Sequence, residues 1–123
     1  MANTDERPAV WTGHISIAGR DLGASSDFYE AIGMRSVHRD DNIAIFELRG
    51  GTHLVVFPDS DAKPGAASWD LMVEDVAATH DAWKTKGLQV SDIEHGSIHD
   101  SFTVTDPTGN SINVNNSHVI GPV

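Results

Sequence analysis

Two side chains, His14 and Asp70, could together carry out acid–base chemistry. Each lies on a predicted strand in which apolar residues alternate with it, Ile15 beside His14 and Leu71 beside Asp70, so both point away from the core. A carboxylate beside an imidazole can fix its tautomer and raise its basicity, which makes a general acid/base couple. Three interpretations stay open: a hydrogen-bonded pair with a structural role, a couple for catalysis or ligand binding, and a shifted metal site that also includes His53.

The same alternation predicts a pocket of mixed polarity around this pair, suited to a mid-sized organic ligand with a few hydrogen-bonding groups. His99 precedes a predicted strand, either in a solvent-exposed loop or in one that reaches the ligand at the mouth of the pocket. The amides of Asn113 and Asn115 are explained equally well as ligand contacts and as groups that satisfy a sheet edge. The predicted ligand-binding residues are His53, Phe46, Phe57, Ser68, Met72, His99, Asn113 and Asn115.

The elements that position these residues occur twice in the chain. In each half a strand with period-two alternation leads to an aspartate that caps a helix, and a glycine ends the helix. A hairpin follows in each half, and its turn is Gly50-Gly51 in the first and the motif DPTGN in the second. The sequence therefore predicts an internal repeat of a strand, a helix and three more strands. The matching positions include Asp21 and Asp75, Tyr29 and Trp83, and Gly33 and Gly87, each pair 54 residues apart.

The repeat defines the expected domain organisation. Residues 1–10 are polar and contain a proline, which predicts a flexible N-terminal arm. Residues 11–123 are predicted to form a single domain of two modules, about 11–57 and 68–116. The proline-containing and glycine-containing stretch 58–67 is the expected linker between them.

Composition restricts the partners. A chain of 123 residues with 39% hydrophobic residues can bury one core, and a formal charge of -10 repels nucleic acids and anionic lipid. The absence of cysteine excludes disulfides and thiolate ligands and fits a reducing compartment. No apolar run is long enough to span a membrane, and the first residues do not have the pattern of a secretion signal. We therefore expect a cytoplasmic protein with a small-molecule partner, and no nucleic-acid or membrane partner.

Several motifs then occur in one order along the chain: His14, Asp21-Leu22, Phe28-Tyr29, Gly33-Met34, VEDVAA at 73–78 and DPTGN at 106–110. Together they resemble the vicinal oxygen chelate superfamily, which includes glyoxalase I, fosfomycin and bleomycin resistance proteins, and extradiol dioxygenases. The resemblance covers roughly residues 12–116. It implies an α+β fold in which two tandem βαβββ modules form a cupped mixed sheet, usually completed as a homodimer.

The resemblance also implies four positions for a metal ion, one on the first and one on the last strand of each module. These positions are His14, Val55, Ser68 and Asn113. A divalent ion wants at least three imidazole or carboxylate donors, and His14 alone is one of these types. The family pattern therefore predicts a degraded metal site and no cofactor. A nonstandard site for Zn, Ni, Mn or Fe around His14, Asp70 and His53 stays open.

Three functions remain after this reasoning. The expected one is binding of an organic ligand in the cup, as bleomycin resistance proteins do, or metal-free proton transfer. The alternative is a divalent-metal-dependent lyase or dioxygenase with the nonstandard ligand set around His14 and Asp70. The third function is that of a sheet module that assembles only with another chain. Whether the protein is an enzyme is left open; if it is, a glyoxalase-like lyase or a dioxygenase is expected.

Overall fold

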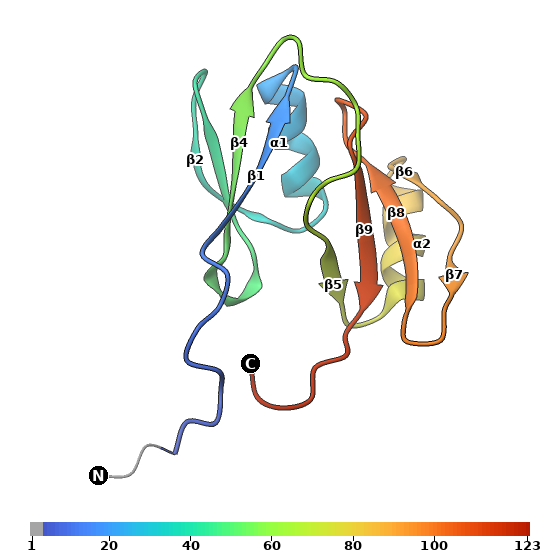
Figure 1. The fold of residues 1–123 in the computed structure, drawn as a ribbon. Helices are drawn as coiled ribbons and strands as arrows, with labels where there is room; N and C mark the ends of the chain where they lie inside the picture. The colour runs from blue at the N-terminus through green and yellow to red at the C-terminus, as the bar shows by residue number, and fades with distance from the viewer. Residues whose placement is uncertain (1–3) are drawn as a thin grey trace.

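The computed structural model describes residues 4–123, so the first three residues of the predicted arm lie outside the described residues. Two sheets, each with one helix packed on it, stand side by side and are joined by a linker that arches over one end (Figure 1). The α+β fold implied by the family resemblance is confirmed. Module 1 contains β1 (His14–Gly19), α1 (Leu22–Ala31), β2 (Arg35–Arg39), β3 (Ala44–Glu47), a short 3-10 turn (Arg49–Gly51) and β4 (His53–Pro58). Module 2 contains β5 (Leu71–Val73), α2 (Val76–Thr85), β6 (Gln89–Val90), β7 (Glu94–His95), β8 (Asp100–Thr105) and β9 (Ser111–Asn116).

Both modules have the same strand order. In module 1 the order is β1-β4-β3-β2, and in module 2 it is β5-β9-β8-β6 with β7 also paired to β8. The first strand of each module is parallel to its last, since β1 pairs with β4 and β5 with β9. Module 2 thus has one more short strand than the predicted repeat. Both β6 and β7 are two residues long, too short to show alternation in the sequence.

The two helices begin and end by the same local chemistry. The Asp21 carboxylate accepts from the backbone N–H of Ala24 at 3.0 Å, and the Asp75 carboxylate accepts from Ala78 at 2.9 Å. Each is an N-cap that satisfies an otherwise unpaired donor of the first turn. After the helices, Gly33 and Gly87 have φ of 110° and 83°, a region where L side chains are strained. The caps and stops predicted from the repeat are therefore present in both modules.

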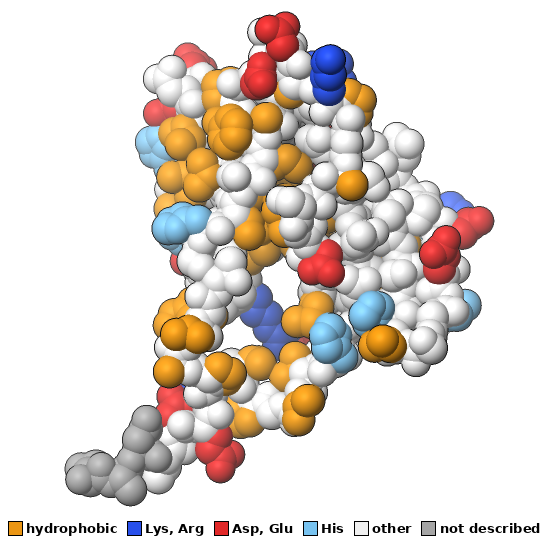
Figure 2. Space-filling view, in the orientation of Figure 1, with side chains coloured by type: hydrophobic (Ala, Val, Ile, Leu, Met, Phe, Trp, Pro, Cys, Tyr) orange, Lys and Arg blue, Asp and Glu red, His pale blue; other side chains and the backbone are white. Residues whose placement is uncertain are grey.

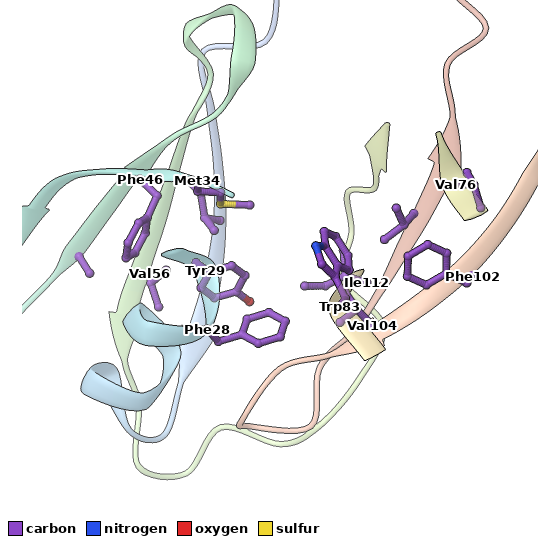
Figure 3. Close-up of a cluster of buried hydrophobic side chains, with 13 residues drawn as sticks. Phe28, Tyr29, Met34, Phe46, Val56, Val76, Trp83, Phe102, Val104 and Ile112 are labelled. Carbon is purple, nitrogen blue, oxygen red and sulfur yellow. The ribbon is translucent and has the colours of Figure 1, made fainter. Parts of the chain in front are cut away.

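The core lies between the sheets and the helices and continues from one module into the other. Figure 3 shows Phe28 and Tyr29 of α1 facing Trp83 of α2 across the space between the modules. The ring centroids of Trp83 and Phe102 are 5.6 Å apart, edge to face. The two sheets therefore share one core, as the composition predicted for a chain of this length.

Polar contacts also join the modules, and most of them use the DPTGN turn. The buried Tyr29 hydroxyl donates to Oδ2 of Asp106 at 2.8 Å. The Arg20 backbone N–H donates to Oγ1 of Thr108 at 3.0 Å. Burial, followed by the charge of Asp106 and this hydrogen bond, raises the pKa of Tyr29 well above its usual value. The hydroxyl therefore keeps its proton and remains a donor, and the turn acts as the joint between the modules.

A second close contact fixes helix α1 on strand β1. A Cβ built on Gly19 would lie 2.5 Å from Oγ of Ser25 and 3.3 Å from its Cβ. Ser25 is fully buried, and its hydroxyl has no hydrogen-bond partner among the described residues. The side chain at position 19 must therefore be absent for the helix to approach the strand this closely.

Alanine substitutions at Gly19 and Ser25 should change the stability of the protein by different amounts. Gly19→Ala should destabilise the protein by about 1–3 kcal/mol, because the new methyl group overlaps the Ser25 hydroxyl. Ser25→Ala removes the overlapping atom and a buried hydroxyl without a partner, so alone it should change stability by less than about 1 kcal/mol. The double variant should recover most of the loss. Urea unfolding followed by tryptophan fluorescence measures all three, and strictly additive effects would show that the two positions do not touch.

Candidate functional site

We call the sheet surface opposite the two helices the cup face. On β1, Ile15 and Ile17 pack against the core, while His14 is exposed. On β5, Leu71 packs against the core, and Met72 points outward with 51% of its surface exposed. His14 on β1 and Met72 on β5 therefore point to the cup face, as the alternation predicted. Figure 2 shows the hydrophobic side chains that gather over β1 and β4 in this view.

Phe46 does not lie on the cup face, so that prediction is wrong. Phe46 is fully buried, and its ring lies 6.1 Å from that of Tyr29 (Figure 3). The cause is the register of the hairpin. Residues directly opposite on paired strands share a face, and Phe46 is opposite Leu54, which is itself fully buried in the core. The sequence analysis assigned Phe46 to the same pocket as His53 and Phe57, and this register places Phe46 on the opposite face from both.

Glu47 lies on the cup face of β3, as Ile45 does, and the sequence analysis missed it. It lies opposite His53 in the register, and its Oε1 is 3.1 Å from His53 Nε2. Its other oxygen, Oε2, accepts from the guanidinium of Arg35 on β2. These contacts, with Arg35 first and His53 second, lower the pKa of Glu47. The signal in the sequence was the alternation of Ala44, Ile45, Phe46 and Glu47, once Phe46 is assigned to the core.

This ion pair gives His53 a defined role. With Glu47 ionised, Nε2 of a neutral His53 donates to it, which leaves Nδ1 as the acceptor. The ring of His14 stands edge-on to that of His53, with centroids 6.0 Å apart. Two imidazoles, one of them oriented by a carboxylate, therefore lie together at the starts of β1 and β4. They could exchange a proton with a ligand or accept hydrogen bonds from it.

Asp70 does not form the predicted couple with His14. Its Oδ2 accepts from Nδ2 of Asn115 at 3.0 Å, while the ring neighbour of His14 is His53. Each thus has its partner in its own module, and within residues 4–123 no hydrogen bond joins the two. Asn115 is 7% exposed, so its amide holds Asp70 in position and is not available to a ligand. Sequence spacing could not reveal this pairing, because it depends on how the lead into β5 lies against β9.

The other predicted ligand contacts lie in three places. Phe57 is 43% exposed at the end of β4, and the exposed Ser68 and Asn113 belong to module 2. Trp69 donates from Nε1 to the backbone oxygen of Ser16 at 3.0 Å, so the segment before β5 lies beside β1. His99 is in the turn between β7 and β8, where its ring stacks on that of His118.

The residues at the family's four metal positions do not fit a divalent ion. Val55 has no donor atom, and the hydroxyl of Ser68 and the amide of Asn113 are weak neutral ligands. That leaves the imidazole of His14, one good ligand where three or more are needed. Within residues 4–123, no three His, Asp or Glu side chains are grouped so that they could hold a metal ion.

A cavity of about 520 Å³ lies at the end of module 1 where β1 and β4 begin. The N-terminal arm forms one side of it, through residues that include Val10 and Trp11. The last residue, Val123, also lines it, and Figure 2 shows an opening in this part of the molecule. Val10 and Trp11 are 81% and 70% exposed.

Comparison with known proteins gives a family and a fold. A model of the Glyoxalase/Bleomycin resistance protein/Dioxygenase superfamily matches residues 11–114. A comparison with curated proteins found no match. No helix in the described part of the chain is long and apolar enough to cross a membrane.

Solved structures of similar fold include enzymes and binding proteins. Lactoylglutathione lyase from Agrobacterium tumefaciens has a TM-score of 0.74 at 18% identity, over 91% of this chain and 96% of that one. A bleomycin-binding protein in complex with bleomycin has a TM-score of 0.69 at 19% identity, over 89% and 100%. An antibiotic-binding protein from Streptomyces sp. has a TM-score of 0.70 at 20% identity, over 89% and 98%. At these identities the likeness shows the fold alone.

Proposed function

We propose that this chain, which belongs to the Glyoxalase/Bleomycin resistance protein/Dioxygenase superfamily, binds a small organic molecule on its cup face without a resident divalent metal. The observation that carries the proposal is the mixed chemistry left uncovered on that face. Phe57 near the end of β4 and Met72 on β5 expose large apolar surfaces, and the imidazoles of His14 and His53 lie at the starts of β1 and β4 on the same face. Apolar area supplies affinity, and a few oriented polar groups supply specificity, as in most small-molecule sites.

The proposed roles of the cup-face residues follow from their contacts. His53, oriented by Glu47, contacts the ligand through Nδ1, and His14 contacts it beside His53. Asp70, held by Asn115, provides a carboxylate that can accept from a donor on the ligand. Ser68 and Asn113 are further hydrogen-bonding groups from module 2. In a catalytic version of this site, the two imidazoles carry the proton and no metal takes part.

We further propose that the working form is a homodimer. Large apolar side chains are exposed at the arm, on the cup face and at the C-terminal tail, and a second copy of the chain could cover them. They include Val10, Trp11, Phe57, Met72, Val119 and Ile120. Light scattering should give twice the chain mass of 13.2 kDa. A monomeric mass at micromolar concentration would contradict the homodimer.

Binding is tested with two probes, bleomycin and S-lactoylglutathione, chosen because proteins of the same fold bind one and are named for the other. Protein dialysed against chelator should be stabilised by at least one of them, because a ligand that binds only the folded state raises the melting temperature. His14→Ala should weaken that binding by about tenfold, the loss of one hydrogen bond of about 1.4 kcal/mol. His80→Ala is the matched control, since His80 lies on α2, on the opposite side of the sheets from the cup face, and its ring contacts the carbonyl of Ser91.

The result also separates the two candidate functions. The neighbouring rings of His14 and His53 are the observation that favours a metal-dependent lyase or dioxygenase with a nonstandard ligand set. If a probe binds only after Zn, Ni, Mn or Fe is added, and His14→Ala abolishes the effect of the metal, that alternative replaces the proposal. If neither probe binds at millimolar concentration with or without metal, the cup-face assignment fails for both ligand chemistries.

A further inference from the structure

The strand register gives module 2 a polar cup face. Val104, Ile112 and Val114 are fully buried in the core, so the residues that alternate with them on β8 and β9 point to the cup face. These residues carry hydroxyl or amide groups: Ser101, Thr103, Thr105, Ser111 and Asn113. Covering such groups costs free energy unless the ligand supplies hydrogen bonds. The part of a ligand that lies on module 2 is therefore polar.

The cup face of module 1 is more apolar. Leu54 and Val56 of β4 are fully buried in the core. Val55 and Phe57 alternate with them and so point to the cup face, where Ile45 lies opposite Val55. In Figure 2 the hydrophobic side chains gather over β1 and β4, whereas the surface over β8 and β9 is mostly white, the colour of uncharged polar side chains and backbone. The two halves of the face therefore suit the two ends of an amphiphilic ligand.

The charged side chains of the face leave its polar half without a cation. No described strand of module 2 contains a lysine or an arginine. Glu94 of β7 lies opposite a cup-face residue of β8 and is exposed. The hydrogen bond to Asp70 comes from the neutral amide of Asn115, at 3.0 Å. In module 1 the guanidinium of Arg35 is already paired with Glu47. The polar half therefore presents carboxylates and other hydrogen-bond acceptors to a ligand.

Asp70 lies where the two halves of the face meet. Trp69, the preceding residue, donates from Nε1 to the backbone oxygen of Ser16 at 3.0 Å. Ser16 on β1 is in turn opposite Val55 on β4. Neighbouring strands lie about 4.8 Å apart, and one strand, β1, separates the segment that carries Asp70 from the apolar surface of β4. A ligand with one ring system and a short side arm can therefore contact both.

We propose that the ligand of the cup face is an amphiphilic organic cation, with its apolar body on module 1 and an ammonium group at Asp70. This ligand class rests on the proposed function, because it assumes that the cup face binds a small molecule. An ammonium group donates hydrogen bonds and is complementary to the carboxylate and to the hydroxyl and amide oxygens around it. His53, which accepts through Nδ1, also favours a ligand that donates. An anionic ligand would be repelled by Asp70 and Glu94.

Three naphthalene probes of similar size and different charge test this ligand class: naphthylethylamine, naphthylethanol and naphthylacetic acid. In NMR titrations at neutral pH and low salt, the amine should bind at least about tenfold more tightly than the acid, with the alcohol between them. The naphthalene ring should shift the backbone amides of Val55 and Phe57. The ammonium group should shift the side-chain amide of Asn115, because that amide is bonded to Asp70.

Asp70→Asn keeps the size of the side chain and removes its charge. In this variant the preference for the amine over the alcohol should fall from about fivefold to less than about twofold. Asp81→Asn is the matched control, because Asp81 is exposed on α2, on the other side of the sheets. It changes the formal charge of -10 by the same amount, and it should leave the preference unchanged.

Three results would overturn this ligand class. The first is an affinity for the acid that equals or exceeds that for the amine, and the second is a preference for the amine that persists in Asp70→Asn. Both leave small-molecule binding on the cup face intact. The third is that none of the three probes binds. If dilution of the protein alone then shifts the cup-face resonances, a second copy of the chain occupies the face. If bleomycin and S-lactoylglutathione also fail to bind, the proposed function is wrong as well.

Discussion

Asp106→Ala is expected to lower the free energy of unfolding by about 3–5 kcal/mol, although Asp106 has no place in the proposed ligand site. Its carboxylate accepts from the Tyr29 hydroxyl at 2.8 Å and from the backbone N–H groups of Thr108 and Asn110 at 3.0 and 2.8 Å. It also accepts from Nδ2 of Asn110 at 3.0 Å. Alanine leaves these donors without an acceptor at a site that is 4% exposed.

Tyr29→Phe is the matched control, because it removes one of these bonds and leaves the turn intact. It should cost about 1–2 kcal/mol by urea unfolding. Equal losses in the two variants would show that the turn does not depend on Asp106 beyond its contact with Tyr29.

The same pair predicts a dependence on high pH. The raised pKa of Tyr29 means that the folded state keeps the phenol proton while the unfolded state releases it near pH 10. The protonated Tyr29 hydroxyl therefore contributes its full stabilisation below about pH 10, and this stabilisation declines as the pH rises further. Tyr29 is the single tyrosine of the chain, so tyrosinate absorbance reports it directly. Ionisation near pH 10 in the folded protein would contradict the buried hydrogen bond.

Phe46→Ala is expected to destabilise the protein by about 3–5 kcal/mol, the usual cost of removing a buried phenylalanine ring. Its ring is fully buried against Tyr29, so its loss leaves a cavity in the core of module 1. Phe57→Ala is the control on the adjacent strand, since Phe57 is 43% exposed and should change stability by less than about 1 kcal/mol. Urea unfolding separates the two. A small loss of unfolding free energy in Phe46→Ala would contradict the burial of Phe46 in the core.

The contrast between Phe46 and Phe57 shows what sequence periodicity can and cannot predict. In β1 the core-packed Ile15 and Ile17 alternate with polar or small residues. In β5 the core-packed Leu71 and Val73 flank the exposed Met72, so the period of two assigned the core side of both strands correctly. In β3 three of four residues are apolar, and either face could have been the buried one. The register across the Gly50-Gly51 turn decides the matter, and a shift of one residue reverses every side chain. The error over Phe46 and the failure to identify Glu47 have this single cause.

The candidate site was predicted less completely than the fold because it depends on pairings between distant segments. The repeat could be counted from caps and stops that act within a few residues, such as Asp21 and Gly33. The partners of His14 and Asp70 lie 39 and 45 positions away, at His53 and Asn115, and local chemistry does not encode them. The DPTGN turn was recognised as a motif, but its role as the joint between modules appears only when Tyr29 is seen to reach Asp106.

Metal content measured by mass spectrometry, on protein purified without chelator, tests the central claim that the cup face works without a resident divalent metal. The wild-type chain should carry fewer than about 0.1 equivalents of Zn, Ni, Mn or Fe. The matched variant V55E/S68H/N113E adds two carboxylates and one imidazole at the other three positions that the resemblance implies, and it should carry close to about one equivalent. Near-stoichiometric metal in the wild-type protein that disappears in His14→Ala would contradict the account.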